Sequence, residues 1–282
     1  MIHVASTADL RAARAHLSQP LGLVPTMGYL HEGHVSLVRR ARDECTSVGV
    51  SIFVNPTQFG PKEDLAAYPR DLERDLRLLD SAGVDLIWTP PVDELYPPGF
   101  QTWVTVEALS QPLEGERRPG HFRGVATIVT KLFNAFQPQR AYFGQKDAQQ
   151  VAVVRRMARD LDFPIEIIVC PTVREADGLA MSSRNAYLDP DERRAATVLF
   201  RSLQASRRAF EAGETDAELL RQAMRQELAG EPLARPDYVS VADVETLQEL
   251  AGPVSQALLS MAVHIGRTAL IDNLLIGGSG GA

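Results

Sequence analysis

A strand, a loop and a helix follow one another near the N-terminus, and this order constrains the fold most. The apolar run from Leu21 to Val24 predicts a buried strand, which Pro25 is expected to end. Residues 35–41 have apolar positions at helical spacing, and Gly28 and Gly33 allow close backbone approach in the loop. Because strand and helix alternate in parallel sheets, the stretch predicts an α/β domain.

Two histidines, His31 and His34, stand where that helix is expected to begin. A helix start carries unpaired N–H groups and the positive end of the helix dipole, and residues three apart lie on one face. Two imidazoles there favour a phosphate site. The pattern His-x-Gly-His is short, however, so an ordinary loop without function is the alternative that other segments must exclude.

The rest of the first half repeats the alternation of strand and helix. A helix capped by Ser6 or Thr7 and running to about Leu17 is expected first. Further strands are expected at Val48–Val54, Val84–Trp88, Ala141–Phe143 and Ile165–Val169, with a possible one at Thr102–Val106, and helices at Asp71–Ala82, Val125–Phe136 and Ala148–Leu161. The prediction is a Rossmann-like domain with a parallel sheet and right-handed crossovers.

The residue composition changes after Pro171, where a polar, glycine-containing segment begins. One long helix is expected from Pro190 to about Ala212, and another at Thr215–Ala229, before strands at Tyr238–Val241, Leu258–Val263 and Ala269–Ile276. We therefore expect a domain at 1–175 and a smaller α+β domain at 176–282 that covers the active site. The glycine-rich end from Gly277 to Gly281 predicts a flexible tail.

Composition excludes several classes of function. The 282 residues carry a formal net charge of −7, which argues against a nucleic-acid coat or a polybasic membrane anchor. Cys45 and Cys170 are the only cysteines, too few for a disulfide framework, and we expect both to be buried thiols. No secretory signal and no run of 18 apolar residues is visible, so a cytoplasmic location is expected.

Polar side chains follow four of the expected strands. They are His31 and His34, Asn55 and Gln58, Lys146 and Gln150, and Ser182, Ser183 and Arg184. The carboxyl ends of parallel strands meet at one edge of a sheet, where such folds bind ligands. The chain has neither a Walker A sequence nor Gly-x-Gly-x-x-Gly, so we expect a phosphate site of another kind.

Five blocks of sequence, in this order, carry a resemblance to a known family. They are residues 25–34, 53–60, 118–122, 142–150 and 181–185. The chain resembles the pantothenate synthetase (pantoate–β-alanine ligase) family, part of the His-x-Gly-His nucleotidyltransferase superfamily. The resemblance implies ATP-dependent condensation of (R)-pantoate with β-alanine through a pantoyl adenylate, with release of pyrophosphate and AMP. It also implies Mg²⁺ and a homodimer.

The resemblance also assigns roles by matching position. It implies catalytic roles for His31, His34, Lys146 and Arg184, with His34 as the acid. It implies contacts to ATP from those residues and from Met27, Gly28, Tyr29, Leu30, Glu32, Gly33, Gly144, Gln145, Asp147, Val173, Met181, Ser182 and Ser183. Pantoate would be held by Gln58 and Gln150, with Asn55 in support.

One departure and two alternatives stay open. Ala180 stands just before Met181, where the phosphate loop of the related class I aminoacyl-tRNA synthetases usually has a lysine, so Lys146 and Arg184 are expected to supply the charge. No protein ligand for Mg²⁺ is assigned, and Asp75, next to Arg74, is interpreted as part of a solvated helix face. The alternatives are a plain nucleotidyltransferase and a nucleotide-binding protein without catalysis.

Overall fold

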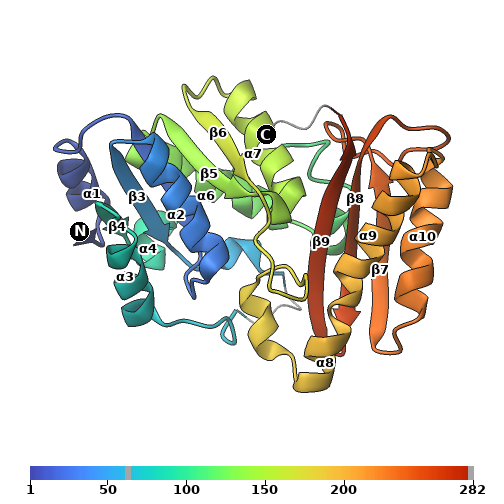
Figure 1. Ribbon diagram of the computed structural model, residues 1–282. Helices are drawn as coiled ribbons and strands as arrows, with labels where there is room; N and C mark the ends of the chain where they lie inside the picture. The colour runs from blue at the N-terminus through green and yellow to red at the C-terminus, as the bar shows by residue number, and fades with distance from the viewer. Residues whose placement is uncertain (61–64, 279–282) are drawn as a thin grey trace. The chain divides into compact units, whose positions relative to one another are not determined.

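The computed structural model describes residues 1–60 and 65–278 (Figure 1). Two compact units are present. The first unit comprises residues 1–110, 115–145 and 149–171, and the second unit comprises 111–114, 146–148 and the chain from 172 on. The expected domain boundary after residue 175 stays a prediction. Ser279 to Gly281 of the predicted tail lie outside the described residues, as does Pro61, which ends the loop expected after the strand at Val48–Val54.

The first unit is built on a parallel sheet of six strands, in the order β1-β4-β3-β2-β5-β6. The strands are β1 (Ile2–Val4), β2 (Leu21–Thr26), β3 (Ser47–Ile52), β4 (Leu86–Trp88), β5 (Arg140–Gly144) and β6 (Glu166–Cys170). The parallel α/β architecture predicted from the sequence is confirmed. Sequence analysis missed β1, whose three residues are too few to show a pattern.

Helices cover both faces of this sheet (Figure 1). The helices along the chain up to residue 160 are α1 (Thr7–Arg14), α2 (Glu32–Glu44), α3 (Leu72–Ser81), α4 (Val92–Leu95), α5 (Glu114–Arg117), α6 (His121–Phe136) and α7 (Ala148–Asp160), with 3₁₀ turns η1 (Pro56–Gln58) and η2 (Gln145–Asp147). Leu37 and Val38 of α2 pack into one core with Val24. Phe136 of α6 meets the ring of Trp88, with centroids 6.0 Å apart. Cys45 and Cys170 are buried and free, as expected.

The order in which strands are added to the sheet changes side at β2. The chain continues from β2 to β3 and β4 on one side, and then places β5 and β6 on the other. β2 pairs with β3 along all six residues, from Leu21 to Thr26, but with β5 only at Gly22 and Leu23. The carboxyl ends of β2 and β5 therefore do not share a hydrogen-bond ladder. This is the switch point at which open α/β sheets bind ligands.

Two predictions about strands were wrong. β2 continues through Pro25 to Thr26, because Pro25 lies beyond the residues that pair with β5 and its missing N–H breaks no ladder on that side. Residues 102–106 form no strand, since the Val104 N–H donates to Oγ1 of Thr127 on α6, 3.0 Å away, instead of to a neighbouring strand.

The second unit has an antiparallel sheet in the order β7-β8-β9, as expected for an α+β domain. Its elements are η3 (Ser183–Tyr187), α8 (Pro190–Ala195), α9 (Val198–Glu211), α10 (Ala217–Ala229), β7 (Ala234–Ala242), β8 (Gln256–Ile265) and β9 (Thr268–Gly277). Leu203 of α9, Met224 of α10 and Leu259 of β8 share one core. Helices α9 and α10 pack on this sheet (Figure 1).

The single long helix predicted from residue 190 to 212 was wrong, because the structure has two helices there. Ala196 and Thr197 keep right-handed helical angles, but the Thr197 and Leu199 amides bond to carbonyls three residues back. The Thr197 hydroxyl also donates to the carbonyl of Arg194 at 2.8 Å. The turn is thus tightened by a local side-chain bond that apolar spacing does not reveal.

Within the described residues, no helix is long and apolar enough to cross a membrane.

Gly124 lets α6 approach η1 at backbone contact. A Cβ at residue 124 would lie 2.5 Å from the carbonyl oxygen of Thr57. Alanine in a helix ordinarily stabilises by up to about 1 kcal/mol relative to glycine. We expect Gly124→Ala to destabilise instead, by about 1–3 kcal/mol in urea unfolding, because η1 must move.

Gly230→Ala is the control, since its nearest contact would be at an ordinary 3.4 Å and its φ is −74°. A Gly124→Ala protein as stable as Gly230→Ala would contradict the tight approach of α6 to η1.

Candidate active site

His31 and His34 cap the start of α2 with their own rings. His31 is the N-cap residue, and its Nδ1 accepts from the Gly33 N–H at 3.1 Å. His34 Nδ1 accepts from the His31 N–H at 3.3 Å, which completes a reciprocal capping box. The two ring centroids are 4.1 Å apart. The His-x-Gly-His spacing therefore builds the helix start itself.

These caps decide which nitrogen each histidine presents. A backbone N–H can only donate, so Nδ1 of each ring must be the acceptor. In the neutral imidazole, the proton then sits on Nε2. His31 and His34 thus carry two Nε2–H donors at a helix start, after the strand at the switch point.

The loop between β2 and α2 has an unusual backbone that Asp75 holds in place. Gly28 has φ of +81° and Tyr29 has φ of +50°, both in the left-handed region. The Tyr29 N–H donates to Asp75 Oδ2 at 2.7 Å, and the Leu30 N–H donates to Oδ1 at 2.8 Å. The guanidinium of Arg74 lies 5.5 Å from the centre of the Tyr29 ring. One carboxylate on α3 therefore stabilises the strained turn that leads to the histidines.

The interpretation of Asp75 as part of a solvated helix face was wrong. Its side chain is only 1% exposed. Burial raises the pKa of the Asp75 carboxyl, although the N–H groups of Leu30 and Tyr29 oppose that rise. The sequence around Asp75 gives no signal for this role, because its partners lie more than forty residues earlier in the chain.

Asn55 and Gln58, which follow β3, form a second buried group. Asn55 Nδ2 donates to Gln58 Oε1 at 2.9 Å and to the Gly124 carbonyl at 3.2 Å, and its Oδ1 accepts from Thr57. The amide of Asn55 is thus engaged within the protein on both sides. Gln58 keeps its Nε2 as a donor, since Asn55 occupies its oxygen.

His121 and Arg118 hold the backbone of Gln58, a role that sequence reasoning missed. His121 Nδ1 lies 2.8 Å from the Gln58 carbonyl oxygen, and Arg118 donates to the same oxygen at 3.4 Å. His121 is the first residue of α6 and Arg118 lies just before its N-cap, both in one of the five resembling blocks. That block was the available signal, but the bond crosses more than sixty residues of sequence.

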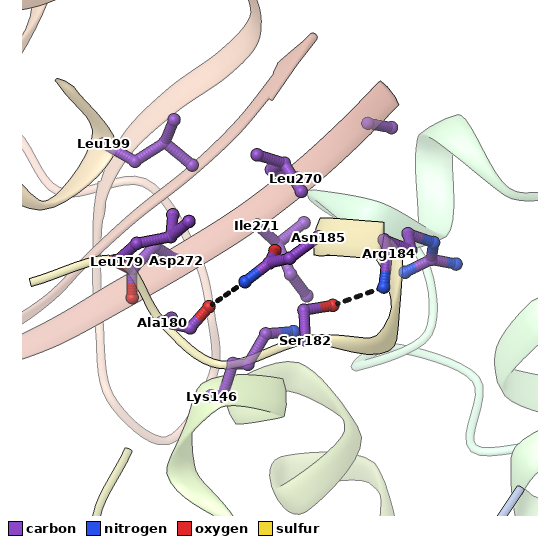
Figure 2. Close-up of a pocket in the computed structure, with 11 residues that line it drawn as sticks. Lys146, Leu179, Ala180, Ser182, Arg184, Asn185, Leu199, Leu270, Ile271 and Asp272 are labelled. Carbon is purple, nitrogen blue, oxygen red and sulfur yellow. Dashed lines mark hydrogen bonds between the residues drawn. The ribbon is translucent and has the colours of Figure 1, made fainter. Parts of the chain in front are cut away.

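In the second unit, Lys146, Ser182 and Arg184 line one pocket (Figure 2). Its empty volume is about 290 Å³, including space open to solvent. Ser182 Oγ accepts from the Arg184 N–H at 3.2 Å and so caps η3. Two cations and a hydroxyl that line the same pocket suit a phosphate group.

Val173 and Met181 are brought together by a short hairpin. The Met181 N–H donates to the Val173 carbonyl at 3.0 Å, and Arg174 forms an antiparallel bridge with Ala180. Asn185 secures the turn from the other side, donating to the Ala180 carbonyl at 3.1 Å (Figure 2).

The remaining predicted residues are spread over several elements. Gly144 ends β5, Gln145 and Asp147 lie in η2, and Gln150 is half-buried on α7. Leu30 is part of the core, and Glu32 pairs with Arg39 at the surface. Among residues 1–60 and 65–278, no three histidine, cysteine, aspartate or glutamate side chains are grouped as metal ligands.

A parallel sheet with a histidine-capped helix at its switch point defines an α/β protein of the His-x-Gly-His type. The chain belongs to the pantoate-β-alanine ligase family, because the model of that family matches residues 2–275.

Named relatives agree with this family. The pantothenate synthetase of Roseiflexus castenholzii is 63% identical, over 97% of this chain and 98% of its own length. The crystal structure of pantothenate synthetase from Thermus thermophilus has a TM-score of 0.93 at 52% identity, over 97% and 99% of the two chains. The Francisella tularensis pantoate-β-alanine ligase, solved with β-γ ATP and β-alanine, has a TM-score of 0.81 at 34% identity, over 98% and 97%.

The raised pKa of Asp75 gives a test in the isolated protein. A group whose pKa is higher when folded binds its proton more tightly in the folded state, so it lowers stability as pH rises from its usual pKa to the raised one. Asn cannot titrate. The stability of the wild type relative to Asp75→Asn should therefore fall across that window, measured by urea unfolding at a series of pH values. A relative stability that rises instead would show that the two N–H bonds outweigh burial.

Proposed function

We propose that this chain condenses (R)-pantoate with β-alanine at the expense of ATP, forming pantothenate, AMP and pyrophosphate. Family membership supports the proposal, as does the Francisella tularensis relative, which was solved with β-γ ATP and β-alanine. The single observation that carries it in this structure is the histidine pair. Two Nε2–H donors at a helix start after β2 fit the phosphates of ATP.

The reaction has two steps. The pantoate carboxylate attacks the α-phosphorus of ATP, forming the acyl phosphate bond while pyrophosphate leaves. The amine of β-alanine then attacks the acyl carbon, forming the amide while AMP leaves and the amine loses a proton. Neither step needs a nucleophile from the protein. The protein must hold reactants in line and stabilise charge that grows on phosphate oxygens.

The histidines and the loop before them would serve the nucleotide. His31 and His34 would donate hydrogen bonds through Nε2–H to phosphate oxygens, His34 toward the leaving pyrophosphate. The acid role that the resemblance implies for His34 would require Nδ1 to be protonated as well, and so the His31 N–H bond to Nδ1 to be released. The amides of Tyr29 and Leu30 are already bound to Asp75, so contacts of Met27 to Leu30 with ATP would use other atoms of that loop.

The cations of the second unit would complete charge neutralisation. Lys146, with a side chain only 17% exposed, and Arg184 would bind phosphate oxygens, and Ser182 and Ser183 would add hydroxyl donors. Val173, Met181 and residues 144–147 would contact the nucleotide. These assignments rest on matching positions in the resembling blocks.

Pantoate would be bound by amides. Gln58 offers its Nε2 donor, while Gln150 on α7 offers a second amide to the hydroxyl and carboxylate groups of pantoate. Asn55 would act mainly by holding Gln58, since its own amide is engaged within the protein.

Asp75, the carboxylate that binds the backbone before the histidines, does not fit a metal ligand. Both oxygens of Asp75 accept backbone N–H groups, and the side chain is buried. Mg²⁺ would thus enter with ATP, bound by phosphates and water.

The proposal also includes a homodimer in the cytoplasm, and light scattering would determine the oligomeric state.

Pantoate and ATP, supplied with and without β-alanine, test the proposal. We expect pantoate-dependent exchange of pyrophosphate into ATP without the amine, and release of free AMP only when the amine is present. Adenylate that accumulates whether or not the amine is added would favour a plain nucleotidyltransferase. Absence of any exchange would favour a nucleotide-binding protein without catalysis.

Removal of one cation should be costly. Lys146→Ala is expected to lower kcat by about 10²–10³, because one donor to the growing charge disappears while the fold stays intact. Lys131→Ala is the matched control, since its ammonium lies 5.0 Å from the Phe100 ring in the first unit. Both variants would be assayed for overall condensation and for thermal unfolding. Unchanged turnover in Lys146→Ala would remove it from the site.

A further inference from the structure

We propose that Asn273 on β9 is the positioning residue of Lys146, and that Asp272 and Arg174 hold it in that role. The inference rests on the proposed function, because it assigns a task to groups that do not themselves touch the substrates. All the residues involved belong to the second unit.

Asn273 fixes the backbone of the residue whose ammonium is needed. Its Nδ2 donates to the Lys146 carbonyl oxygen at 2.8 Å, across 127 positions of sequence. Asn273 is only 5% exposed. A buried amide on a strand of an antiparallel sheet is a rigid support, whereas Lys146 itself lies in a single 3₁₀ turn, η2. The sheet thereby sets where the lysine stem starts.

Asp272 orients Asn273 and is itself tightly held. It accepts the Asn273 N–H at 2.8 Å and a two-pronged contact from Arg174, at 2.6 and 2.9 Å. The Asp272 side chain is 1% exposed. A paired guanidinium and carboxylate fix each other's planes, so the direction of the neighbouring Asn273 is fixed as well.

Arg174 extends the same network to the segment that precedes Ser182 and Arg184. It donates to the Gly178 carbonyl at 3.0 Å and lies over the Phe200 ring at 4.1 Å from its centre. Its backbone bridges to Ala180, next to the segment that bears Ser182 and Arg184. One buried carboxylate, Asp272, therefore connects the supports of both pocket cations.

The ion pair also resolves a conflict of charge in this pocket. Asp272 lines the pocket with Lys146 and Arg184, and an unpaired carboxylate would repel a phosphate there (Figure 2). Arg174 neutralises it from within the protein at hydrogen-bond distance. Lys146, whose Nζ lies 3.7 Å from the exposed Asp147 Oδ1, and Arg184 then face an anion without the charge of Asp272 opposing it.

The supporting role of Asp272 and Asn273 is not visible in the sequence, because both residues stand inside an apolar run. Residues 269–276 predict a strand, and two polar residues in its middle resemble ordinary solvent-facing positions. Both are buried instead, at 2% and 5% exposure, and a buried polar pair needs partners that only the fold supplies.

A double-mutant cycle with Asn273→Ala and Lys146→Ala tests the inference. We expect Asn273→Ala to lower kcat roughly 10- to 100-fold with little change in the KM for pantoate, because a displaced lysine misses the transition state. In the Lys146→Ala background, the same change should cost almost nothing, since the group that it positions is gone. A purely structural role would give equal losses in both backgrounds.

Ser260→Ala is the matched control. Ser260 is paired with Asn273 across β8 and β9, is 5% exposed, and its hydroxyl has no hydrogen-bond partner among the described residues. It should keep wild-type kcat. Asn273→Ser, which keeps a polar group in the buried position, serves if Asn273→Ala does not fold. Failure of both to fold would overturn the inference, because Asn273 would then belong to the stability of the sheet.

The outcomes separate the inference from the proposed function. Absence of pantoate-dependent pyrophosphate exchange in the wild-type enzyme would overturn the function and the inference together. Normal wild-type exchange, a loss in Lys146→Ala and full activity in Asn273→Ala would overturn the inference alone.

Discussion

The contact on which the candidate site most depends is that of the buried Asp75 carboxylate with two backbone N–H groups. It stabilises the left-handed backbone at Gly28 and Tyr29, and so decides the direction in which the chain leaves β2. The next residues then cap α2 with their own rings. Backbone conformation, helix start and histidine tautomer thus form one chain of causes, each step fixed by the one before it.

In the second unit, too, a buried carboxylate holds neighbouring groups in place. Asp272 is nearly as buried as Asp75, and its oxygens also accept hydrogen bonds from within the protein, here from the Arg174 guanidinium and the Asn273 backbone N–H. In both units a carboxylate provides support without presenting free charge. The predicted ligand is an anion, which an uncompensated carboxylate would repel. Because the oxygens of both carboxylates accept hydrogen bonds within the protein, they hold the surrounding groups in place while their charge is compensated.

Local pattern was enough to predict the framework and part of the candidate site. Alternating strands and helices, and polar residues after strands, are properties of short windows, so the parallel sheet and the position of the histidine pair were accessible. Asp75, His121 and Asn273 were not, because each acts on a residue more than forty positions away. Helix breaks such as Thr197 depend on one side-chain bond, which spacing cannot show.

The short pairing of β2 with β5 has a consequence beyond the placement of loops. Only Gly22 and Leu23 of β2 share a ladder with β5, whereas β5 continues to pair with β6 as far as Gly144. Backbone groups that lose a sheet partner must find another one, in a side chain, another backbone group, water or a ligand, since they cannot stay unsatisfied. The centre of the sheet therefore has a gap in its hydrogen-bond ladder, bordered by main-chain atoms of β2 and β5. Side-chain substitutions can change the surroundings of this gap, but no single substitution can remove the main-chain donors and acceptors that border it.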